Sequence, residues 1–302
     1  MSTSLLQPIK VGQYHGYGIT YKSSQLQVIS DLGCNPNILI LDGQKVLDTN
    51  TQSSDLRQNI LSKGNFLAPF PNRIADGKYT FEGNAHQLEI NEKERGNALH
   101  GLIFQRPFTL HASAECNKGI IATFKTQISK NNFKGYPFAI EILISFILKE
   151  KELRIGMIGN NIGTTNAPFG VGWHPYMTTG KNIDNLHLTL PARSILETDQ
   201  GKELIPTGNK LPNDFGTKKR RIGDCCFDTC FTDLERQSVH FENIELFMDT
   251  KMQYVQIYTP EHRTAIAIEP MSCAPNAFNN GMGLEVLKPQ ESISYHFGIV
   301  IN

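Results

Sequence analysis

The sequence of 302 residues lacks the features that mark several large classes of protein. It has no run of about 18 apolar residues that could span a membrane, and its start, MSTSLLQPIK, lacks the basic-then-apolar order of a secretory signal. Basic and acidic residues both total 29, so the formal net charge is zero and no basic surface for nucleic acid is indicated. We therefore expect a cytoplasmic protein that binds neither a membrane nor nucleic acid and acts on a small, roughly neutral molecule.

Motifs for common cofactors are also missing. The sequence has no GxxxxGK[ST], no GxGxxG between a strand and a helix, and no HExxH, so no nucleotide, metal or other cofactor is expected. Three of the six cysteines, Cys225, Cys226 and Cys230, are close enough together to suggest zinc, but no second pair of ligands follows at the usual separation. We predict reduced thiols and no structural disulfide.

What the sequence does contain is a series of short apolar stretches rich in β-branched and aromatic residues, separated by Gly, Pro, Asn and Asp. This pattern is typical of antiparallel sheet. Strands are predicted at residues 120–128, 138–148, 153–158, 254–258, 264–268 and 293–301, with a hairpin turn at 149–152. The best helical candidate, around 55–61, spans barely two turns. The sequence predicts an all-β protein, a large antiparallel β-sandwich with few short helices, and one domain over residues 1–302.

Four segments place polar residues in Gly- and Pro-rich turns between the predicted strands, where chemistry could occur. They are residues 65–74 with Asn72 and Arg73, residues 96–102 with His100, residues 167–176 with Trp173, His174 and Tyr176, and residues 268–278 with Glu269. Each segment alone has a structural explanation, because a histidine in a turn is commonly hydrogen-bonded and an arginine in a loop commonly forms a salt bridge.

Taken together and in order, these segments resemble those of the aldose 1-epimerases, also called mutarotases. The resemblance covers most of the chain and rests on P-x-x-N-R-I at Pro69–Ile74, G-x-Y-x-F-x-G at Gly77–Gly83, N-A-L-H-G at Asn97–Gly101, G-Y-P at Gly135–Pro137, W-H-P-Y at Trp173–Tyr176, and E-P at Glu269–Pro270. It implies the galactose mutarotase-like β-sandwich, with an open cleft that binds a sugar.

The resemblance also implies roles for individual residues. Glu269 is similar to the general base of the family, His174 to its general acid, and His100 and Arg73 to the residues that hold and polarise the sugar. Asp228, in F-D-T-C-F, resembles a carboxylate that hydrogen-bonds sugar hydroxyls. Substrate contacts are further expected from Asn72 of the N-R motif and from the aromatic residues Trp173 and Tyr176, since sugars present apolar faces to rings.

The chemistry of ring opening supports the first two roles independently. A base must remove the proton of the C1 hydroxyl while an acid delivers one to the ring oxygen. A carboxylate with an ordinary pKa of about 4.3 and an imidazole with one of about 6.5 suit these tasks, and a neighbouring carboxylate can keep the imidazole protonated. Glu269 and His174 fit this description.

Some alternatives stay open. Glu269 is followed by P-M-S-C-A-P rather than by the P-Q pattern of the best-known galactose mutarotases, which leaves the preferred sugar undecided. A hexose-6-phosphate epimerase would need more basic residues than Arg73, a sugar-binding module would not need both Glu269 and His174, and a glycoside hydrolase could pair Asp228 with Glu269. A monomer is expected, with a dimer as the alternative.

Overall fold

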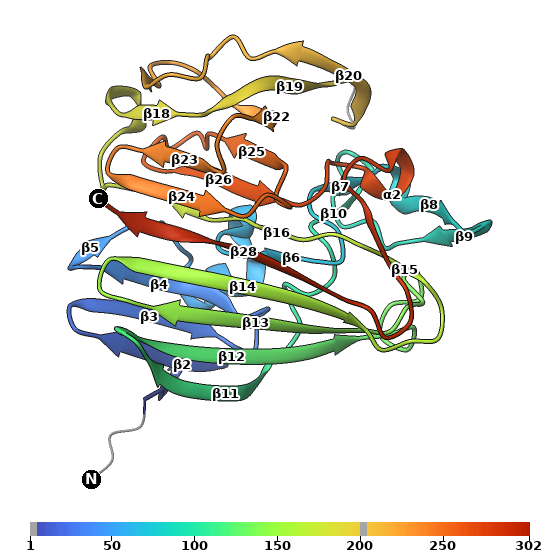
Figure 1. Cartoon of the computed structure of the whole chain (residues 1–302), viewed down its shortest axis with the longest axis horizontal. Coiled ribbons are helices and arrows are strands. Elements are labelled where there is room, and N and C mark those ends of the chain that lie inside the picture. Colours follow the sequence, from blue (N-terminus) through green and yellow to red (C-terminus); the bar gives the residue numbers. More distant parts are fainter. Residues whose placement is uncertain (1–4, 200–203) are drawn as a thin grey trace.

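The computed structural model describes residues 5–199 and 204–302, so the first four residues of the segment tested for a secretory signal lie outside the described part. Regular structure in this part is mostly antiparallel strand, arranged in one five-stranded, one eight-stranded and one nine-stranded sheet with three two-stranded ribbons (Figure 1). The fold is therefore the all-β sandwich that the sequence predicts. None of the described helices has the length and apolar character needed to span a bilayer.

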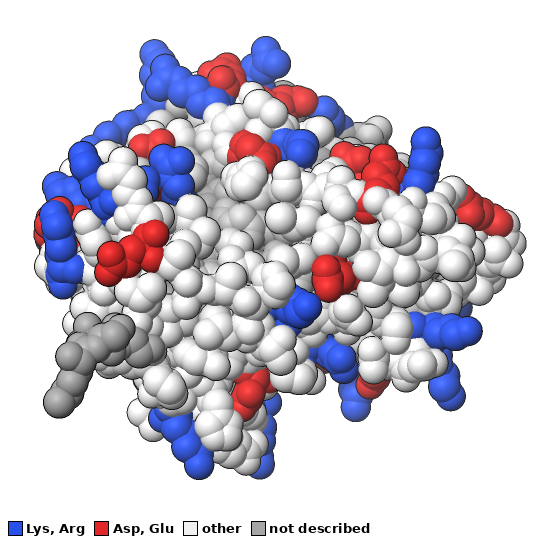
Figure 2. Space-filling view, turned by 60° about the horizontal axis from the view of Figure 1, so that its bottom comes forward, with Lys and Arg blue, Asp and Glu red and all other residues white. Residues whose placement is uncertain are grey.

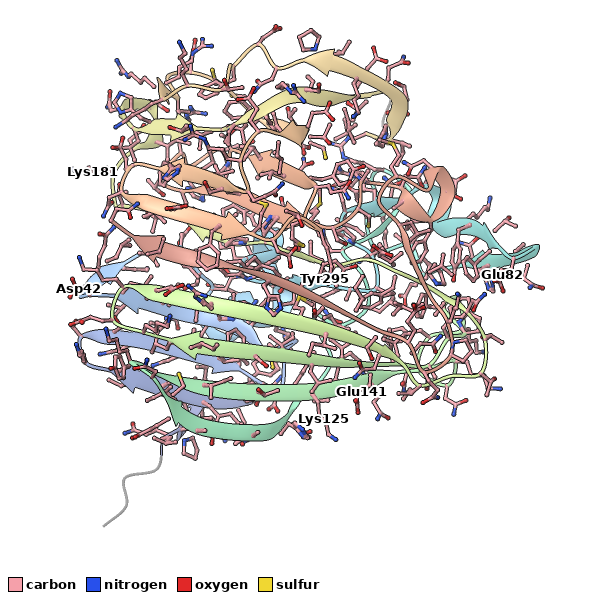
Figure 3. The ribbon with its side chains drawn as sticks, viewed as in Figure 1. Asp42, Glu82, Lys125, Glu141, Lys181 and Tyr295 are labelled. Atoms are coloured by element: carbon pink, nitrogen blue, oxygen red, sulfur yellow. The ribbon has the colours of Figure 1, made fainter. Side chains whose placement is uncertain are left out.

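The nine-stranded sheet contains the longest strands. In spatial order it consists of β11 (Thr109–Cys116), β12 (Gly119–Ile128), β13 (Ile140–Leu148), β14 (Glu152–Asn161), β28 (Ser292–Ile301), β24 (Ile244–Met248), β23 (Ser238–Phe241), β18 (His187–Thr189) and β21 (Arg220–Arg221). Alternate residues of β13 are buried and the intervening ones are half-exposed, as the two-residue period of a strand requires. Figure 3 labels two of the half-exposed residues, Lys125 on β12 and Glu141 on β13.

The five-stranded sheet is formed by the N-terminal part of the chain. Its strands are β1 (Gln7–Val11), β2 (Tyr14–Tyr21), β3 (Ser24–Ile29), β4 (Asn35–Leu41) and β5 (Gln44–Lys45). It lies against β12 and β13 (Figure 1), where Tyr17 packs on Phe124 with ring centroids 5.5 Å apart. Figure 2 shows Lys, Arg, Asp and Glu interspersed around one face of the molecule, in agreement with the zero net charge.

The eight-stranded sheet carries most of the segments singled out in the sequence. Its strands are β20 (Pro206–Pro212), β19 (Ala192–Thr198), β22 (Asp228–Leu234), β25 (Tyr254–Tyr258), β26 (Ile266–Met271), β16 (Gly172–Trp173) and β6 (Phe66–Leu67), with β17 (Tyr176–Met177) also paired to β26. The ribbons are β7 (Arg73–Ile74) with β10 (Ala98–Leu99), β8 (Lys78–Phe81) with β9 (Asn84–Gln87), and β15 (Ala167–Phe169) with β27 (Glu285–Leu287).

The helical segments of the described residues are short. They are α1 (Ser53–Gln58), α2 (Ala277–Asn280) and the 3-10 turns η1 (Ile60–Ser62), η2 (Ala75–Gly77) and η3 (Ile183–Asn185). The helix predicted around 55–61 is present but ends earlier, because Asn59 adopts a left-handed conformation with φ of 52°.

Most predicted strands are confirmed, with small shifts at their ends. The 149–152 turn joins β13 to β14, where the Lys149 N–H donates to the Glu152 carbonyl. The strand predicted at 264–268 is wrong in its bounds, since pairing runs from Ile266 to Met271. Arg263, with φ of 48°, turns the chain before this strand, and the strand continues through Glu269 to Met271 rather than ending at residue 268.

A cluster of aromatic rings joins the two larger sheets. Phe66 of β6 lies 5.8 Å from the ring of Phe146 on β13, 6.0 Å from Trp173 on β16 and 6.5 Å from Phe297 on β28. All four side chains are buried. They belong to one cluster of buried apolar residues that draws on all three large sheets.

Replacement of Phe66 by alanine is expected to lower the free energy of unfolding by about 3–5 kcal/mol, because it leaves a cavity between the sheets. Urea unfolding followed by circular dichroism measures this loss. Leu110→Ala on β11, where the residue is 36% exposed, is the control and should change stability by less than about 1 kcal/mol. Equal losses in the two variants would contradict the importance of this cluster.

Candidate active site

The eight-stranded sheet turns one face toward the core and carries a row of polar residues on the other. Gly172 pairs with Met271 and Tyr176 with Ala267, so the intervening His174 lies opposite Glu269. On the other side of β26, Glu269 pairs with Gln256 of β25. Because side chains alternate along a strand, these three polar residues share one face of the sheet.

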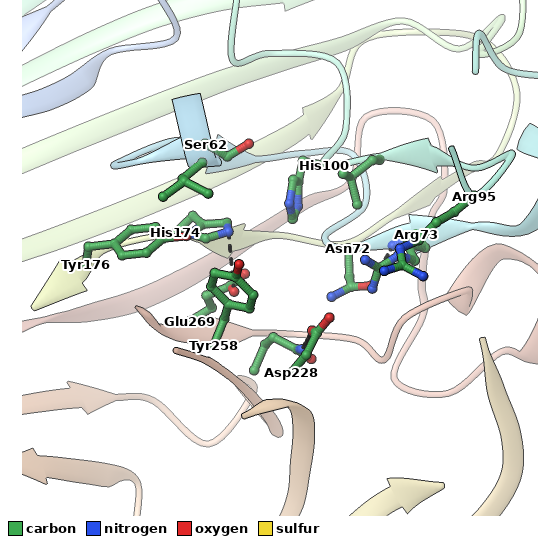
Figure 4. A pocket seen from close by; sticks show the side chains of 13 residues that line it. Ser62, Asn72, Arg73, Arg95, His100, His174, Tyr176, Asp228, Tyr258 and Glu269 are labelled. Carbon is green, nitrogen blue, oxygen red and sulfur yellow. Dashed lines mark hydrogen bonds and ion pairs between the residues drawn. The ribbon is translucent and has the colours of Figure 1, made fainter. Parts of the chain in front are cut away.

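This row forms the base of a cavity of about 270 Å³. Its walls come from the sheet and from the turns around η1, β7 and β10, and its lining residues are Leu61, Ser62, Asn72, Arg73, Arg95, Leu99, His100, His174, Tyr176, Asp228, Gln256, Tyr258 and Glu269. Figure 4 shows His100, His174 and Glu269 on one side, with Asn72, Arg73 and Arg95 grouped away from Tyr176. Seven of the eight residues predicted to form the site therefore line this cavity.

His174 and Glu269 are in direct contact at the base of the cavity. Nε2 of His174 lies 3.4 Å from Oε1 of Glu269, and the two residues are 5% and 2% exposed. Burial lowers the pKa of His174 to about 3. Burial, and then the charge of Asp228, raise the pKa of Glu269 well above its usual value, while Arg73 opposes this rise.

The lowered pKa of His174 and the raised pKa of Glu269 both favour uncharged side chains. The pair then holds one proton on the Glu269 carboxyl group and a neutral imidazole on His174. This differs from the protonated imidazole expected from the sequence, because desolvation of two facing charges in the interior outweighs their mutual attraction. The carboxyl oxygen Oε2 is buried without a hydrogen-bond partner among the described residues.

His100 enters the cavity from a turn that approaches the backbone of another segment closely. Its N–H donates to the carbonyl of Asn72 at 2.9 Å, and its ring meets that of His174 edge-on with centroids 5.0 Å apart. Gly101 follows with φ of 73°, and a Cβ atom there would lie 2.4 Å from the carbonyl oxygen of Ala68. The H-G pair is thus explained by this close approach, which fixes where the imidazole lies.

Arg73 lies on the opposite wall beside Asn72. Its Nε and one Nη donate to both oxygens of Glu92, at distances of 2.9 to 3.2 Å. The backbone N–H of Arg73 donates to the side chain of Asn72, which is 3% exposed and has φ of 54°. Two short strands hold this wall, since Leu99 pairs with Arg73 across the ribbon.

Asp228 begins β22 at the edge of the cavity. Its carboxylate accepts a hydrogen bond of 2.8 Å from Nε2 of Gln256, which is 4% exposed. Asp228 also pairs with Tyr258 across β22 and β25, and the ring of Tyr258 lines the same cavity.

The prediction that Trp173 contacts the substrate is wrong in its geometry. The indole is fully buried on the core face, stacks with Phe66 and Phe297, and donates from Nε1 to the Gly64 carbonyl at 3.2 Å. Since neighbouring residues of a strand face opposite ways, Trp173 must point away from the cavity when His174 points into it. Tyr176, two residues beyond His174, does line the cavity and stacks on the imidazole at 5.2 Å.

Several lining residues were missed in the sequence. Gln256 is a polar residue inside the apolar strand Y-V-Q-I-Y, and this break in the pattern was a usable signal. Arg95 and Ser62 lie on turns outside the four segments, and only the folded chain brings them to the cavity.

Within the described residues no group of three or more His, Cys, Asp or Glu side chains could hold a metal ion. The six cysteines are free thiols.

Comparison with known proteins identifies the family. The model of the aldose 1-epimerase family matches residues 25–299. The chain belongs to the aldose 1-epimerase family. It is 31% identical to the uncharacterized protein YihR of Escherichia coli over 247 residues, covering 78% of each chain. It is 27% identical to pig galactose mutarotase over 206 residues, which covers 63% of this chain and 56% of the pig protein.

Solved structures agree on the fold of this aldose 1-epimerase family member. A galactose mutarotase-like protein from Clostridium acetobutylicum superposes with a TM-score of 0.87 at 19% identity, and each chain is covered to 98%. Galactose 1-epimerase from Lactobacillus acidophilus gives a TM-score of 0.82 at 14% identity, again with 98% of each chain covered. Family membership supports a mutarotase-like sugar epimerase, which is an isomerase.

Trp173→Phe is expected to lower the free energy of unfolding by about 1–3 kcal/mol, because a buried hydrogen bond and core volume are lost. The Michaelis constant for a sugar substrate should stay within about twofold of the native value, since the indole does not reach the cavity. Urea unfolding and polarimetry provide the two measurements. A large rise in the Michaelis constant with unchanged stability would contradict this placement and indicate that Trp173 contacts the substrate.

Proposed function

We propose that this protein is an aldose 1-epimerase that interconverts the α and β anomers of a free aldose, with Glu269 as general base and His174 as general acid. The observation that carries the proposal is the contact of these two buried groups, 3.4 Å apart at the base of a cavity. The cavity is smaller than the usual range for drug-sized ligands, about 300–1,000 Å³, so it suits a single sugar better than a chain of sugars.

The reaction needs a pair of groups that together hold one proton. Hydrogen bonds from sugar hydroxyls, together with the charge of Arg73, favour the Glu269 carboxylate, and the proton then moves to His174. The carboxylate accepts the proton of the C1 hydroxyl, the imidazolium protonates the ring oxygen, and the bond between C1 and the ring oxygen breaks. The open aldehyde rotates about its C1–C2 bond and recloses with the proton transfers reversed, giving the other anomer.

The remaining walls offer groups that suit the hydroxyls of a sugar. Asn72 and Arg73 stand on one wall and His100 beside His174, and the Asp228 carboxylate, which accepts a hydrogen bond from Gln256, lines the same cavity. The ring of Tyr176 supports His174 and borders the cavity. We assign these residues to substrate binding, with Asp228 accepting hydrogen bonds from hydroxyls.

A hexose 6-phosphate is a second candidate substrate, because Arg95 joins Arg73 at the cavity wall. Both guanidinium groups lie beside Glu92, however, at 2.9 Å from Arg73 and 3.5 Å from Arg95. One carboxylate thus offsets part of their charge, which favours the uncharged sugar. The same assay with glucose 6-phosphate separates the two substrates.

Freshly dissolved α-D-glucose and α-D-galactose should approach anomeric equilibrium faster with the native protein, as followed by polarimetry. Glu269→Gln keeps the size of the side chain, His174→Asn replaces the ring by a smaller polar amide, and each removes the proton-transfer group. Each is expected to lower kcat by about 10²–10⁴-fold. Native-like circular dichroism of both variants serves as the control. A native protein inactive on free and phosphorylated aldoses, yet able to bind one, would point instead to a sugar-binding module.

The pH dependence of kcat/KM should follow the number of protons on the pair. As pH falls, His174 takes up a second proton only near its lowered pKa of about 3, so activity is retained down to about pH 4. As pH rises through the raised pKa of Glu269, the pair loses its only proton and activity declines. Initial rates, corrected for uncatalysed mutarotation, measure this profile. An acid limb with its midpoint above about 5 would contradict a buried, neutral His174.

A further inference from the structure

Glu92 does not line the cavity but contacts its wall through the side chain of Arg73. Its two carboxylate oxygens accept hydrogen bonds from Nε and Nη2 of Arg73, three contacts of 2.9 to 3.2 Å. The two side chains are 14% and 11% exposed. A two-point ion pair of this kind fixes the plane of a guanidinium group, which a single contact would leave free to rotate.

Glu92 is itself held in place by its own turn. Nδ2 of Asn97 donates to Oε2 of Glu92 at 2.8 Å, and the backbone N–H of Glu92 donates to the Asn97 carbonyl at 3.1 Å. Gly96 and Asn97 in turn donate their N–H groups to the Glu92 carbonyl at 2.9 and 3.2 Å. The carboxylate therefore stands on a closed turn rather than on a free side chain.

The charge of Arg73 reaches the proposed acid–base pair. It opposes the rise that burial and Asp228 cause in the pKa of Glu269, and it adds to the lowering that burial and His174 cause in the pKa of His100. A carboxylate paired to Arg73 offsets part of this positive charge. Glu92 is thus in a position to act on Glu269 without touching a substrate.

We propose that Glu92 is a positioning residue: its carboxylate holds the Arg73 guanidinium at the cavity wall by a two-point ion pair and offsets its charge. The inference rests on the proposed epimerase function, in which Arg73 binds the sugar. Through this pair the turn at residues 92–97 controls both the affinity for sugar and the alkaline limit of activity.

Other charged groups also face the carboxylates of Glu92 and Glu269, and their contributions to the pKa of Glu269 remain when Glu92 is replaced. Arg73 and Arg95 face Glu92. The titratable groups that interact with Glu269 are His174, Asp228, Arg73, Tyr176 and Cys230. Because all of these remain in a Glu92 variant, a shift of the pH profile can be assigned to the lost carboxylate.

The experiment compares Glu92→Gln with Glu94→Gln. Glu94 lies on the same turn, is exposed and lines no part of the cavity. Its replacement by glutamine therefore removes the same charge without disturbing Arg73. For Glu92→Gln we expect the Michaelis constant for the aldose to rise about three- to tenfold while kcat changes less. The alkaline limb of the pH profile should move to lower pH, because Arg73, no longer offset, stabilises the Glu269 carboxylate. Glu94→Gln should match the native protein in both measurements.

Glu92→Asp separates position from charge and remains informative if Glu92→Gln does not fold. The shorter side chain keeps the charge but loses the two-point contact, so the Michaelis constant should rise with the alkaline limb unchanged. The proposal is overturned if the native protein is active and neither Glu92 variant differs from Glu94→Gln. A native protein without activity on any aldose would instead reject the proposed function.

Discussion

The antiparallel register between β26 and the paired segments β16 and β17 is the constraint on which the candidate site depends. It places His174 opposite Glu269, and the pairing of β25 with β26 adds Gln256 to the same row. A shift by one residue would turn each side chain toward the core and bring apolar neighbours to the cavity. The contacts of Trp173 with Phe66 and Phe297 oppose such a shift, because they fix the core-facing side of β16.

Burial of this row explains the electrostatic character of the site. Two ionisable groups that are almost completely buried favour their uncharged forms, so the proposed acid and base begin with a single shared proton rather than as an ion pair. In the proposed reaction, a sugar that enters the cavity replaces part of the lost solvation with hydroxyl groups. Moving the proton across the 3.4 Å contact from Glu269 to His174 is then favoured by the ligand itself.

The strands could be predicted from the sequence because alternating apolar residues and turn residues are local signals. The candidate site residues came from the resemblance to a family, and all of them except Trp173 line the cavity. The prediction for Trp173 was wrong because Trp173 is adjacent to His174 in sequence but points to the opposite face of the sheet, into the core. Arg95 could not be found in this way, since its place in the cavity depends on how the turn at 92–97 folds onto Arg73. Two further properties depend on burial in the folded chain, which the sequence pattern does not report. They are the partial neutralisation of Arg73 by Glu92 and the protonation state of His174 and Glu269.

The site residues stand on two kinds of backbone, the large sheet and the surrounding turns, and this difference has consequences for the chemistry of the site. Glu269 of the proposed acid–base pair stands within β26, and His174 stands between β16 and β17. The N–H of His174 donates to the Asn65 carbonyl and its own carbonyl accepts from the Gly64 N–H, so the backbone holds both residues in place. Asn72, Arg73 and His100 stand instead on turns and a two-stranded ribbon, where Gly101 and left-handed residues set the path of the chain. Changes in such turns alter the wall without moving the pair. Under the proposed function, the same ring-opening chemistry can thus be combined with different sugars, and Glu92, by fixing Arg73, links the wall built from turns to the acid–base pair.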